Sequence, residues 1–160
     1  MGPGTGATAA DLQMAYELGQ QIAAAGWVLL SGGRSVGVME AVSRGAKAAD
    51  GLTVGILPNS NTTGMSDAID IAIFTDMGNA RNTINVLSSD VVIACGMGTG
   101  TASEVALALK AHKPTILLGW DRVGQAFFQQ LSPAPVEVAE TVEDAIALVR
   151  HILADRDRTP

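Results

Sequence analysis

Short apolar blocks alternate with longer amphipathic stretches along the chain. Four of the blocks are continuous apolar runs bounded by Gly, Pro or Asp, which is typical of parallel strands covered on both faces. They lie at residues 27–31, 53–57, 91–95 and 115–118. Residues 69–74 alternate apolar and polar or small side chains, which predicts an edge or half-covered strand, and a short last strand is expected at 136–139.

Helical patterns fill the intervals between these blocks. They cover residues 8–25, 36–49, 79–89, 101–112 and 141–154, with one further short helix before the last strand. Thr8 is the candidate N-cap of the first helix and Gly26 its stop, while Pro114 follows the fourth. Regular alternation of strand and helix predicts the α/β class, with a doubly wound, mostly parallel sheet and helices on both faces.

A single domain over residues 1–160 accounts for the length. The charged residues 155–160 are expected to form a frayed tail. The start of the chain is unusual, because residues 2–6 (GPGTG) look like the loop that follows a first strand, yet only Met1 precedes them. Two explanations stay open at this point: the first strand is missing from the sequence as given, or the start of the gene is misplaced.

Composition narrows the function classes. Apolar residues make up 48% of the chain and charged residues 16%, which is too apolar for a disordered protein. The net charge of −6 offers no basic footprint for nucleic acid or an anionic membrane, and 4% aromatic residues are too few for a base-stacking platform. No apolar run approaches a membrane span, and the single cysteine suits a reducing compartment, so a cytoplasmic location is expected.

Three glycine-rich turns follow predicted strands or strand positions. They lie at residues 2–6, 31–33 and 96–101. Ligands of open α/β sheets bind at the carboxyl ends of strands, and glycine there lets backbone N–H groups approach an anion. Each turn alone is explained by the need for a tight connection. The three together favour a phosphorylated ligand.

A dinucleotide site is the obvious competitor. Residues 4–9 fit the pattern G-x-G-x-x-A of a pyrophosphate-binding turn. That site also needs an acidic residue about 20 positions later to hold a ribose hydroxyl, and the chain has Ser31, Gly32 and Gly33 there. The missing carboxylate counts against NAD.

Glu104 and Arg81 are the candidate chemical groups. The spacing Thr101-x-x-Glu104 favours a capping box, in which both side chains only satisfy backbone donors. As the alternative, Glu104 lies beside the third glycine turn and binds sugar hydroxyls or acts as a general acid or base. Arg81 either pairs with a phosphate or, as the simpler expectation, is solvated or bound to Asp76.

Other candidates are weaker. His112 and His151 have no carboxylate at ligand spacing, so no metal site is predicted. Cys95 ends an apolar strand and is expected to be a buried thiol, while Trp120 is expected to pack in the core.

Three motifs in order carry a family resemblance. Ser31-Gly32-Gly33-x-x-x-Gly37-Val38-Met39, Arg81-Asn82 and Gly98-Thr99-Gly100-Thr101-x-x-Glu104 resemble the LOG-like Rossmann superfamily. Its members include the LONELY GUY phosphoribohydrolases and the molybdenum cofactor carrier proteins, and many carry the label "possible lysine decarboxylase". The resemblance covers most of residues 2–150 and implies a single Rossmann-like domain and a homodimer.

The two branches of this superfamily imply different activities. In the hydrolases, a glutamate and an arginine carry N-glycosidic cleavage of nucleoside 5′-monophosphates, and Glu104 and Arg81 match them. Asn82 stands where the hydrolases have lysine, and Met97 replaces a glycine, so the sequence is closer to the carriers. Lysine decarboxylation needs a Schiff-base lysine near the glycine turns, and the chain has only Lys47, Lys110 and Lys113 within or at the ends of helices, so this activity is rejected.

The leading hypothesis is a homodimeric binding protein for a phosphorylated, nucleotide-like or pterin ligand, similar to molybdenum cofactor carriers. The ligand is the molybdenum cofactor or a nucleoside monophosphate. Its expected binding residues are Gly32, Gly33, Gly98, Thr99, Gly100, Thr101, Arg81 and Asn82. The alternatives are a phosphoribohydrolase that uses Glu104 and Arg81, and a nucleotide-sensing module.

Overall fold

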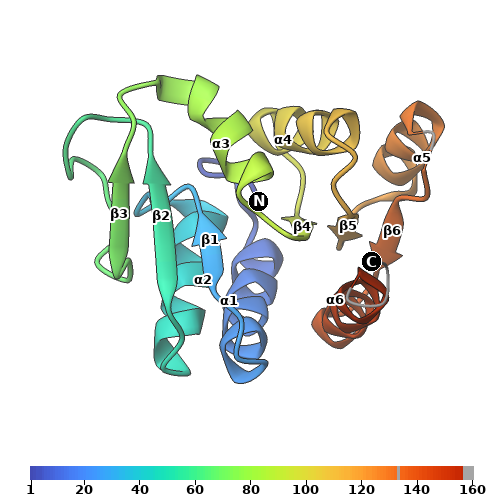
Figure 1. Cartoon of the computed structure of the whole chain (residues 1–160), viewed down its shortest axis with the longest axis horizontal. Coiled ribbons are helices and arrows are strands. Elements are labelled where there is room, and N and C mark those ends of the chain that lie inside the picture. The colour runs from blue at the N-terminus through green and yellow to red at the C-terminus, as the bar shows by residue number, and fades with distance from the viewer. Residues whose placement is uncertain (133, 157–160) are drawn as a thin grey trace.

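A layer of parallel strands lies between two layers of helices in the computed structural model, which describes residues 1–132 and 134–156 (Figure 1). The strands are β1 (Leu29–Ser31), β2 (Thr53–Leu57), β3 (Ile71–Phe74), β4 (Val92–Cys95), β5 (Thr115–Leu118) and β6 (Glu137–Ala139). All six begin within two residues of the positions that the hydrophobic pattern predicts. The α/β class is confirmed.

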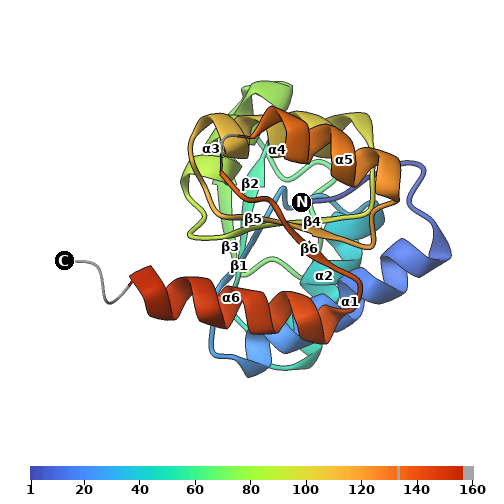
Figure 2. The same cartoon turned by 90° about the vertical axis from the view of Figure 1, so that its right-hand side faces the viewer.

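Helices cover both faces of the strand layer. One face is covered by α1 (Ala9–Ala24), α2 (Gly37–Ala48) and α6 (Val142–Arg156), and the other by α3 (Asn82–Leu87), α4 (Thr99–Lys110) and α5 (Arg122–Leu131) (Figure 2). The predicted helix at 79–89 is divided into a 3₁₀ helix, η1 (Gly78–Arg81), and α3. Within the described ranges, none of the helices has the length and apolar character that crossing a bilayer requires.

The last helix extends two residues into the predicted tail. Asp155 and Arg156 were expected in a frayed tail but belong to α6, where Arg156 pairs with Asp90 at 2.6 Å. This exposed ion pair joins the last turn of α6 to the loop before β4. Residues 157–160 lie outside the described residues.

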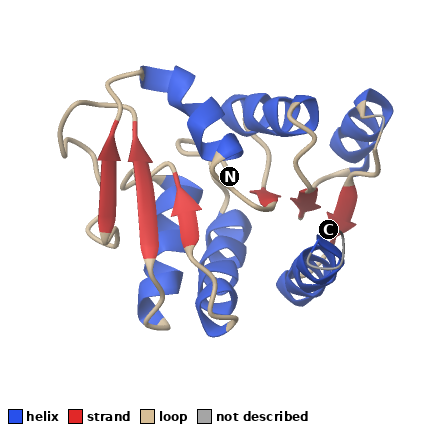
Figure 3. Ribbon diagram, viewed as in Figure 1, coloured by secondary structure: helices blue, strands red, loops and turns tan. Residues whose placement is uncertain are grey.

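The strands form two groups of three, visible in Figure 3. The orders are β1-β2-β3 and β4-β5-β6, and every pair is parallel. The expectation of one continuous sheet therefore needs correction, because β1 and β4 are not hydrogen-bonded to each other. Met1 lies between the two groups (Figure 1). The alternating segment at 69–74 forms edge strand β3, as predicted.

The core explains why the strands read as continuous apolar runs. Along β5, Ile116 and Leu118 face the cluster that includes α1 and α6, whereas Leu117 faces the cluster that includes α4 and α5. Successive strand residues point to opposite faces, so a strand covered on both sides needs apolar residues at every position. Trp120 packs in the second cluster and donates its ring N–H to the Ala94 carbonyl at 2.9 Å, which confirms its core role.

Local interactions fix α1 and its packing. Thr8 caps the helix as predicted, since its hydroxyl accepts from the Asp11 N–H and the Asp11 carboxylate accepts from the Thr8 N–H. Gly45 on α2 packs directly on α1, where an added Cβ would overlap the Tyr16 carbonyl. The two helices are therefore in backbone contact.

Candidate functional site

A cavity of about 1070 Å³ runs along the space between β1 and β4, from their amino ends to their carboxyl ends. The Gly2–Thr5 segment, the turn after β1, η1 with the start of α3, and the first turns of α4 all contribute to its walls. Eight of the residues singled out from the sequence line it. They are Gly32, Arg81, Asn82, Gly98, Thr99, Gly100, Thr101 and Glu104. The fold thus brings the three motifs together at the expected end of the strands.

The two glycines after β1 have different places. Gly32 lies against Arg81, and a Cβ there would lie 2.5 Å from the guanidinium Nη2. A larger residue at this position would require the Arg81 and Met39 side chains to move. Gly33 is not among the lining residues; its φ of +69° and its close approach to Gly55 of β2 make it part of the sheet packing instead.

Arg81 is buried and faces Glu104 (7% exposed each), with Nη1 3.9 Å from Oε1. The expectation of a solvated arginine or an Asp76 partner is wrong. Burial lowers the pKa of the Arg81 guanidinium, the Glu104 carboxylate opposes this, and Arg34 adds to the lowering. The pair is longer than a direct hydrogen bond, so the guanidinium is held near the carboxylate without being locked to it.

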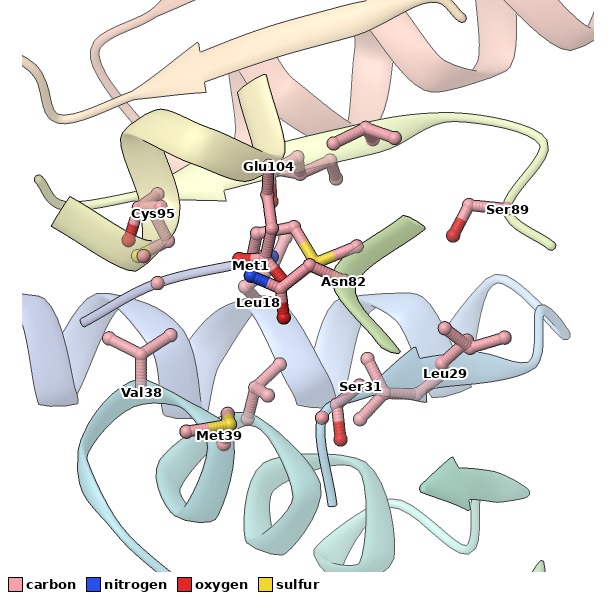
Figure 4. Close-up of a pocket in the computed structure, with 18 of the residues that line it drawn as sticks. Met1, Leu18, Leu29, Ser31, Val38, Met39, Asn82, Ser89, Cys95 and Glu104 are labelled. Carbon is pink, nitrogen blue, oxygen red and sulfur yellow. The ribbon is translucent and has the colours of Figure 1, made fainter. Parts of the chain in front are cut away.

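Glu104 does not form the expected capping box. Helix α4 begins at Thr99 with Gly98 as its N-cap, two residues earlier than predicted, and no side chain caps it. Thr101 and Glu104 are consequently both helical and both point inward. Glu104 accepts a hydrogen bond from the Asn85 amide at 3.2 Å, and Figure 4 shows its side chain directed from α4 into the cavity.

Several buried polar atoms around this pair have no partner. Among the described residues, they include Nε of Arg81, Oδ1 of Asn85 and Oγ1 of Thr101. Buried polar groups in folded proteins are nearly always hydrogen-bonded, so a cluster of unpaired ones in a cavity points to a polar ligand or ordered water.

The start of α4 supplies a second feature of an anion site. The first N–H groups of a helix have no partner within it, and they carry the positive end of the helix dipole. At α4 they belong to Thr99, Gly100 and Thr101, which line the cavity, and an added Cβ at Gly100 would meet nothing within 4 Å. A phosphate or carboxylate can therefore approach this backbone closely.

The start of α2 is occupied by the chain itself. The Val38 N–H donates to the Pro3 carbonyl at 3.0 Å. Gly37 has φ +56°, and a side chain there would overlap Pro3 and Gly4. Loop residues 2–6 therefore lie against α2, and α4 is the helix whose start is open to the cavity.

Other lining residues were missed in the sequence analysis. Arg34 could have been found, because it directly follows the glycine pair at a strand end and contributes a positive charge near Arg81. Asn79 and Ser103 also line the cavity. Asn85, which binds Glu104, is one helical turn beyond Arg81 and belongs to no motif that the sequence signals.

Cys95 lies on the cavity wall as a buried thiol, as predicted. Burial raises its pKa to about 11, so it is protonated and weakly nucleophilic at neutral pH. Over the described ranges, no group of three or more His, Cys, Asp and Glu side chains gathers as metal ligands would.

Comparison with known proteins supports the motif-based resemblance. The molybdenum cofactor binding protein from the phototrophic bacterium Rippkaea orientalis is similar with a TM-score of 0.94 and 62% identity, over 96% of this chain and 94% of that chain. The molybdenum cofactor carrier protein of Chlamydomonas reinhardtii gives a TM-score of 0.92 and 54% identity, over 96% and 95%.

A sequence relative comes from the hydrolase branch. A cytokinin riboside 5′-monophosphate phosphoribohydrolase of Mycobacterium tuberculosis is 38% identical over 97 residues, which are 59% of this chain and 51% of that protein. The chain spans about half to two thirds of the length of the curated relatives that it matches. Likeness to the LOG-like superfamily, and to the carriers within it, is confirmed. A model of the SLOG cluster4 family matches residues 1–146, and the chain therefore belongs to the SLOG cluster4 family.

Proposed function

We propose that this protein binds the molybdenum cofactor, a phosphorylated pterin, as cargo in the cavity beside Arg81 and Glu104. The observation that carries the proposal is the cluster of buried, unpaired polar atoms on Arg81, Asn85 and Thr101. The names of the two similar structures, a cofactor-binding protein and a cofactor carrier, support the identity of the ligand.

The phosphate of this ligand is assigned to the start of α4. The free N–H groups of Thr99, Gly100 and Thr101 form one side of the anion site, and the Thr101 hydroxyl supplies a further donor. Arg81 contributes the positive charge, and its long contact with Glu104 leaves its other N–H groups available.

The pterin is assigned to the part of the cavity near the starts of α3 and α4. Asn79, Asn82 and Ser103 lie there with amide and hydroxyl groups, and the Asn82 amide donates to the Ser103 hydroxyl at 3.3 Å. Groups that both donate and accept suit a ring with alternating donors and acceptors. Met39 supplies a polarisable apolar surface on the α2 side.

Purification from cells that make the cofactor tests this proposal. Molybdenum is measured by elemental mass spectrometry, and the pterin is measured by fluorescence after oxidation. The unaltered chain should retain both, and Arg81→Gln should retain at least about tenfold less because a buried charged contact is lost. Arg44→Gln is the matched control, since Arg44 is an exposed arginine on α2.

One outcome rejects cofactor binding. It is a folded, unaltered chain that retains neither molybdenum nor pterin and does not bind purified cofactor when this is added. Equal retention in Arg81→Gln and Arg44→Gln would instead reject the assigned site.

A phosphoribohydrolase remains the second candidate, favoured by the position of Glu104. Its carboxylate points into the cavity beside Arg81, where it could stabilise a ribosyl cation or activate water. Incubation with a panel of nucleoside 5′-monophosphates, scored for free base by chromatography, tests this activity. Base release that disappears in Glu104→Gln supports hydrolysis, and equal release in that variant removes the mechanism.

We also propose the homodimer and the cytoplasmic location that the sequence led us to expect. Val123, Phe127 and Leu131 form an exposed apolar stripe on α5, which is the surface we assign to the dimer contact. Light scattering tests the assembly: twice the chain mass supports the dimer, and the mass of one chain at micromolar concentration contradicts it. Cell fractionation tests the location.

A further inference from the structure

Asn85 is fully buried beside the cavity but is not one of the residues that line it. Its side chain joins α3 to α4, because Nδ2 donates to Oε1 of Glu104 at 3.2 Å. A carboxylate only accepts hydrogen bonds, so the amide has to present its nitrogen to Glu104. Burial of an amide is costly unless it is hydrogen-bonded, and Oδ1 of Asn85 has no partner among the described residues. The bond to Glu104 is therefore the contact that holds both side chains in place.

The two carboxylate oxygens of Glu104 have different surroundings. Oε1 accepts from Asn85 and also faces Arg81, with 3.9 Å to Nη1. Within the described part of the chain, no group donates to Oε2, and this oxygen is not one of the fully enclosed unpaired atoms. Oε2 is consequently the oxygen that the cavity can reach, and Figure 4 shows the side chain directed into that space.

A free carboxylate oxygen accepts an N–H or O–H group of a ligand and repels its phosphate. Glu104 is recessed, with 7% of its surface exposed, so a group that projects from a ring reaches it better than a ring N–H that is level with the ring edge. Arg81 already opposes the charge of the carboxylate, so the ligand donor can be neutral. A neutral amino group attached to the outside of a ring meets these three conditions.

We propose that Glu104, held by Asn85, accepts a hydrogen bond from the exocyclic amino group of a 2-amino-4-oxopyrimidine ring, which pterins and guanine share. The inference rests on the proposed function, in which a phosphorylated pterin places its phosphate at the start of α4. Glu104 selects the ring by its amino group. Asn85 is a positioning residue, because it acts on the ligand only through Glu104.

Two nucleotides serve as matched probes of this selection. Guanosine 5′-monophosphate and inosine 5′-monophosphate carry the same phosphate and sugar and differ only in the 2-amino group. Calorimetric titration of the unaltered chain should give a dissociation constant at least about tenfold lower for the guanosine compound, as expected for one hydrogen bond to a charged group. Equal dissociation constants would overturn the proposal.

Glu104→Gln is the sharpest variant, because Asn85 determines how the glutamine side chain turns. Nδ2 of Asn85 needs an acceptor, so the new carbonyl oxygen stays on Asn85 and the new NH₂ group faces the cavity, where it opposes a second amino group. The preference for the guanosine compound should disappear or reverse. The control Glu17→Gln alters an exposed glutamate of α1 and should keep the preference. A tenfold preference that survives in Glu104→Gln contradicts the proposal.

Asn85→Leu tests the positioning role, because it removes the donor while keeping a side chain of roughly similar size. The preference for the guanosine compound should fall below about threefold, while the inosine compound should bind within about threefold of its affinity for the unaltered chain. A merely structural role would weaken the two nucleotides alike and leave their ratio unchanged, which would reject positioning by Asn85. If this variant does not fold, Glu104→Gln decides the proposal by itself.

Cofactor retention separates this inference from the proposed function. If the unaltered chain retains the cofactor but binds the two nucleotides equally, only the inference fails. If the chain retains no cofactor but prefers the guanosine compound tenfold, the cargo is rejected and the ring selection stands. If neither nucleotide binds at millimolar concentration, retention of the cofactor decides: at least about tenfold less in Glu104→Gln than in Glu17→Gln supports the inference, and equal retention, or none in the unaltered chain, overturns it.

Discussion

Thr101 links stability to binding through a single hydroxyl group. The residue is buried in the first turn of α4, and its Oγ1 has no partner among the described residues. An unpaired buried hydroxyl costs the free protein stability, and the same hydroxyl is available to a ligand. Removal of this oxygen should therefore affect the two properties in opposite directions.

Thr101→Val should leave the free energy of unfolding unchanged or raise it by up to about 1 kcal/mol, because a methyl group replaces an unsatisfied hydroxyl. Ligand affinity should fall roughly 10- to 100-fold, as expected for a lost hydrogen bond to a charged group. Urea unfolding and calorimetric titration with the cofactor measure the two effects.

Thr53→Val is the matched control. The Thr53 hydroxyl is buried too, but it donates to the Ala68 carbonyl at 2.7 Å and accepts from the Asp70 N–H at 2.9 Å. Loss of this hydroxyl should lower the free energy of unfolding by about 1–3 kcal/mol and leave ligand affinity unchanged. If both valine variants are destabilised equally, Thr101 is satisfied in the free protein and our interpretation of its hydroxyl is wrong.

Cys95 should give stability a distinct alkaline dependence. Its pKa is raised by burial to about 11, above the value near 9 of an exposed thiol. Between these values the unfolded chain loses the proton and the native protein keeps it, so stability falls as pH rises from about 9 to 11, by about 2–3 kcal/mol. Urea unfolding of the unaltered chain and Cys95→Ala across this range should diverge. If the free energies of unfolding of the two proteins change in parallel with pH, the raised pKa of Cys95 is contradicted.

At the level of single residues, the sequence identified the charged and polar residues of the cavity but not the residues that they contact. Arg81, Thr101 and Glu104 were identified by motif, and all three line the cavity. The capping box was predicted wrongly because Thr-x-x-Glu has the same spacing inside a helix as at its start. Asn85 was missed because an asparagine one turn after Arg81 carries no local signal of what it will contact.

At the level of elements, the contact of α1 with α2 depends on two glycines. Gly19 of α1 lies against the Val42 carbonyl, and Gly45 of α2 lies against the Tyr16 carbonyl. Any larger side chain at either position separates the helices. This contact places the start of α2, with its Pro3 partner, beside the cavity.

Gly45→Ala should lower the free energy of unfolding by about 2–3 kcal/mol, since the added methyl group meets backbone that cannot move away locally. Gly100→Ala is the control, because that helical glycine is exposed with nothing near its Cβ position, and alanine there should be neutral or stabilise by up to about 1 kcal/mol. Chemical denaturation measures the free energy of unfolding of both variants. Similar values for the two variants would refute the backbone contact.

Element positions were mostly predictable, because apolar runs and helix stops are local signals. The start of α4 was placed two residues late, since Gly98 acts as N-cap through its backbone and not through a side chain. The division of the helix at 79–89 into η1 and α3 was not predictable, as no proline or glycine marks it after Arg81.

At the level of the whole molecule, one apolar cluster joins the two strand groups. Leu18 of α1 belongs to the same cluster as Val42 on one side and Ile116 on the other. Arg150 of α6 also lies over the Trp27 ring, with 5.5 Å between its Cζ and the ring centroid. The apolar runs alone did not predict the separation of the strands, because they do not report which edges pair; the sign in the sequence was that residues 2–6 look like a loop after a strand, with only Met1 before them.

The two tryptophans should therefore report a single unfolding transition. Trp27 precedes β1 and Trp120 follows β5, so Trp120→Phe and Trp27→Phe each leave a fluorophore in one group. Urea midpoints measured by the fluorescence of each variant should agree with that variant's own midpoint by circular dichroism. In Trp120→Phe, the remaining Trp27 reports on the β1–β3 group. If its fluorescence changes at a lower urea concentration than the circular dichroism of the same variant, the two groups unfold separately.

The unpaired atoms around Arg81 also bear on how long an empty molecule survives in a cell. A ligand at a hundred times its dissociation constant adds about 2.7 kcal/mol to the stability of the folded state, which lowers the unfolded population roughly a hundredfold. Proteases act on that population. With the cofactor as ligand, loaded molecules would persist while empty ones are degraded, and cofactor supply would set the abundance of the protein without any change in its synthesis.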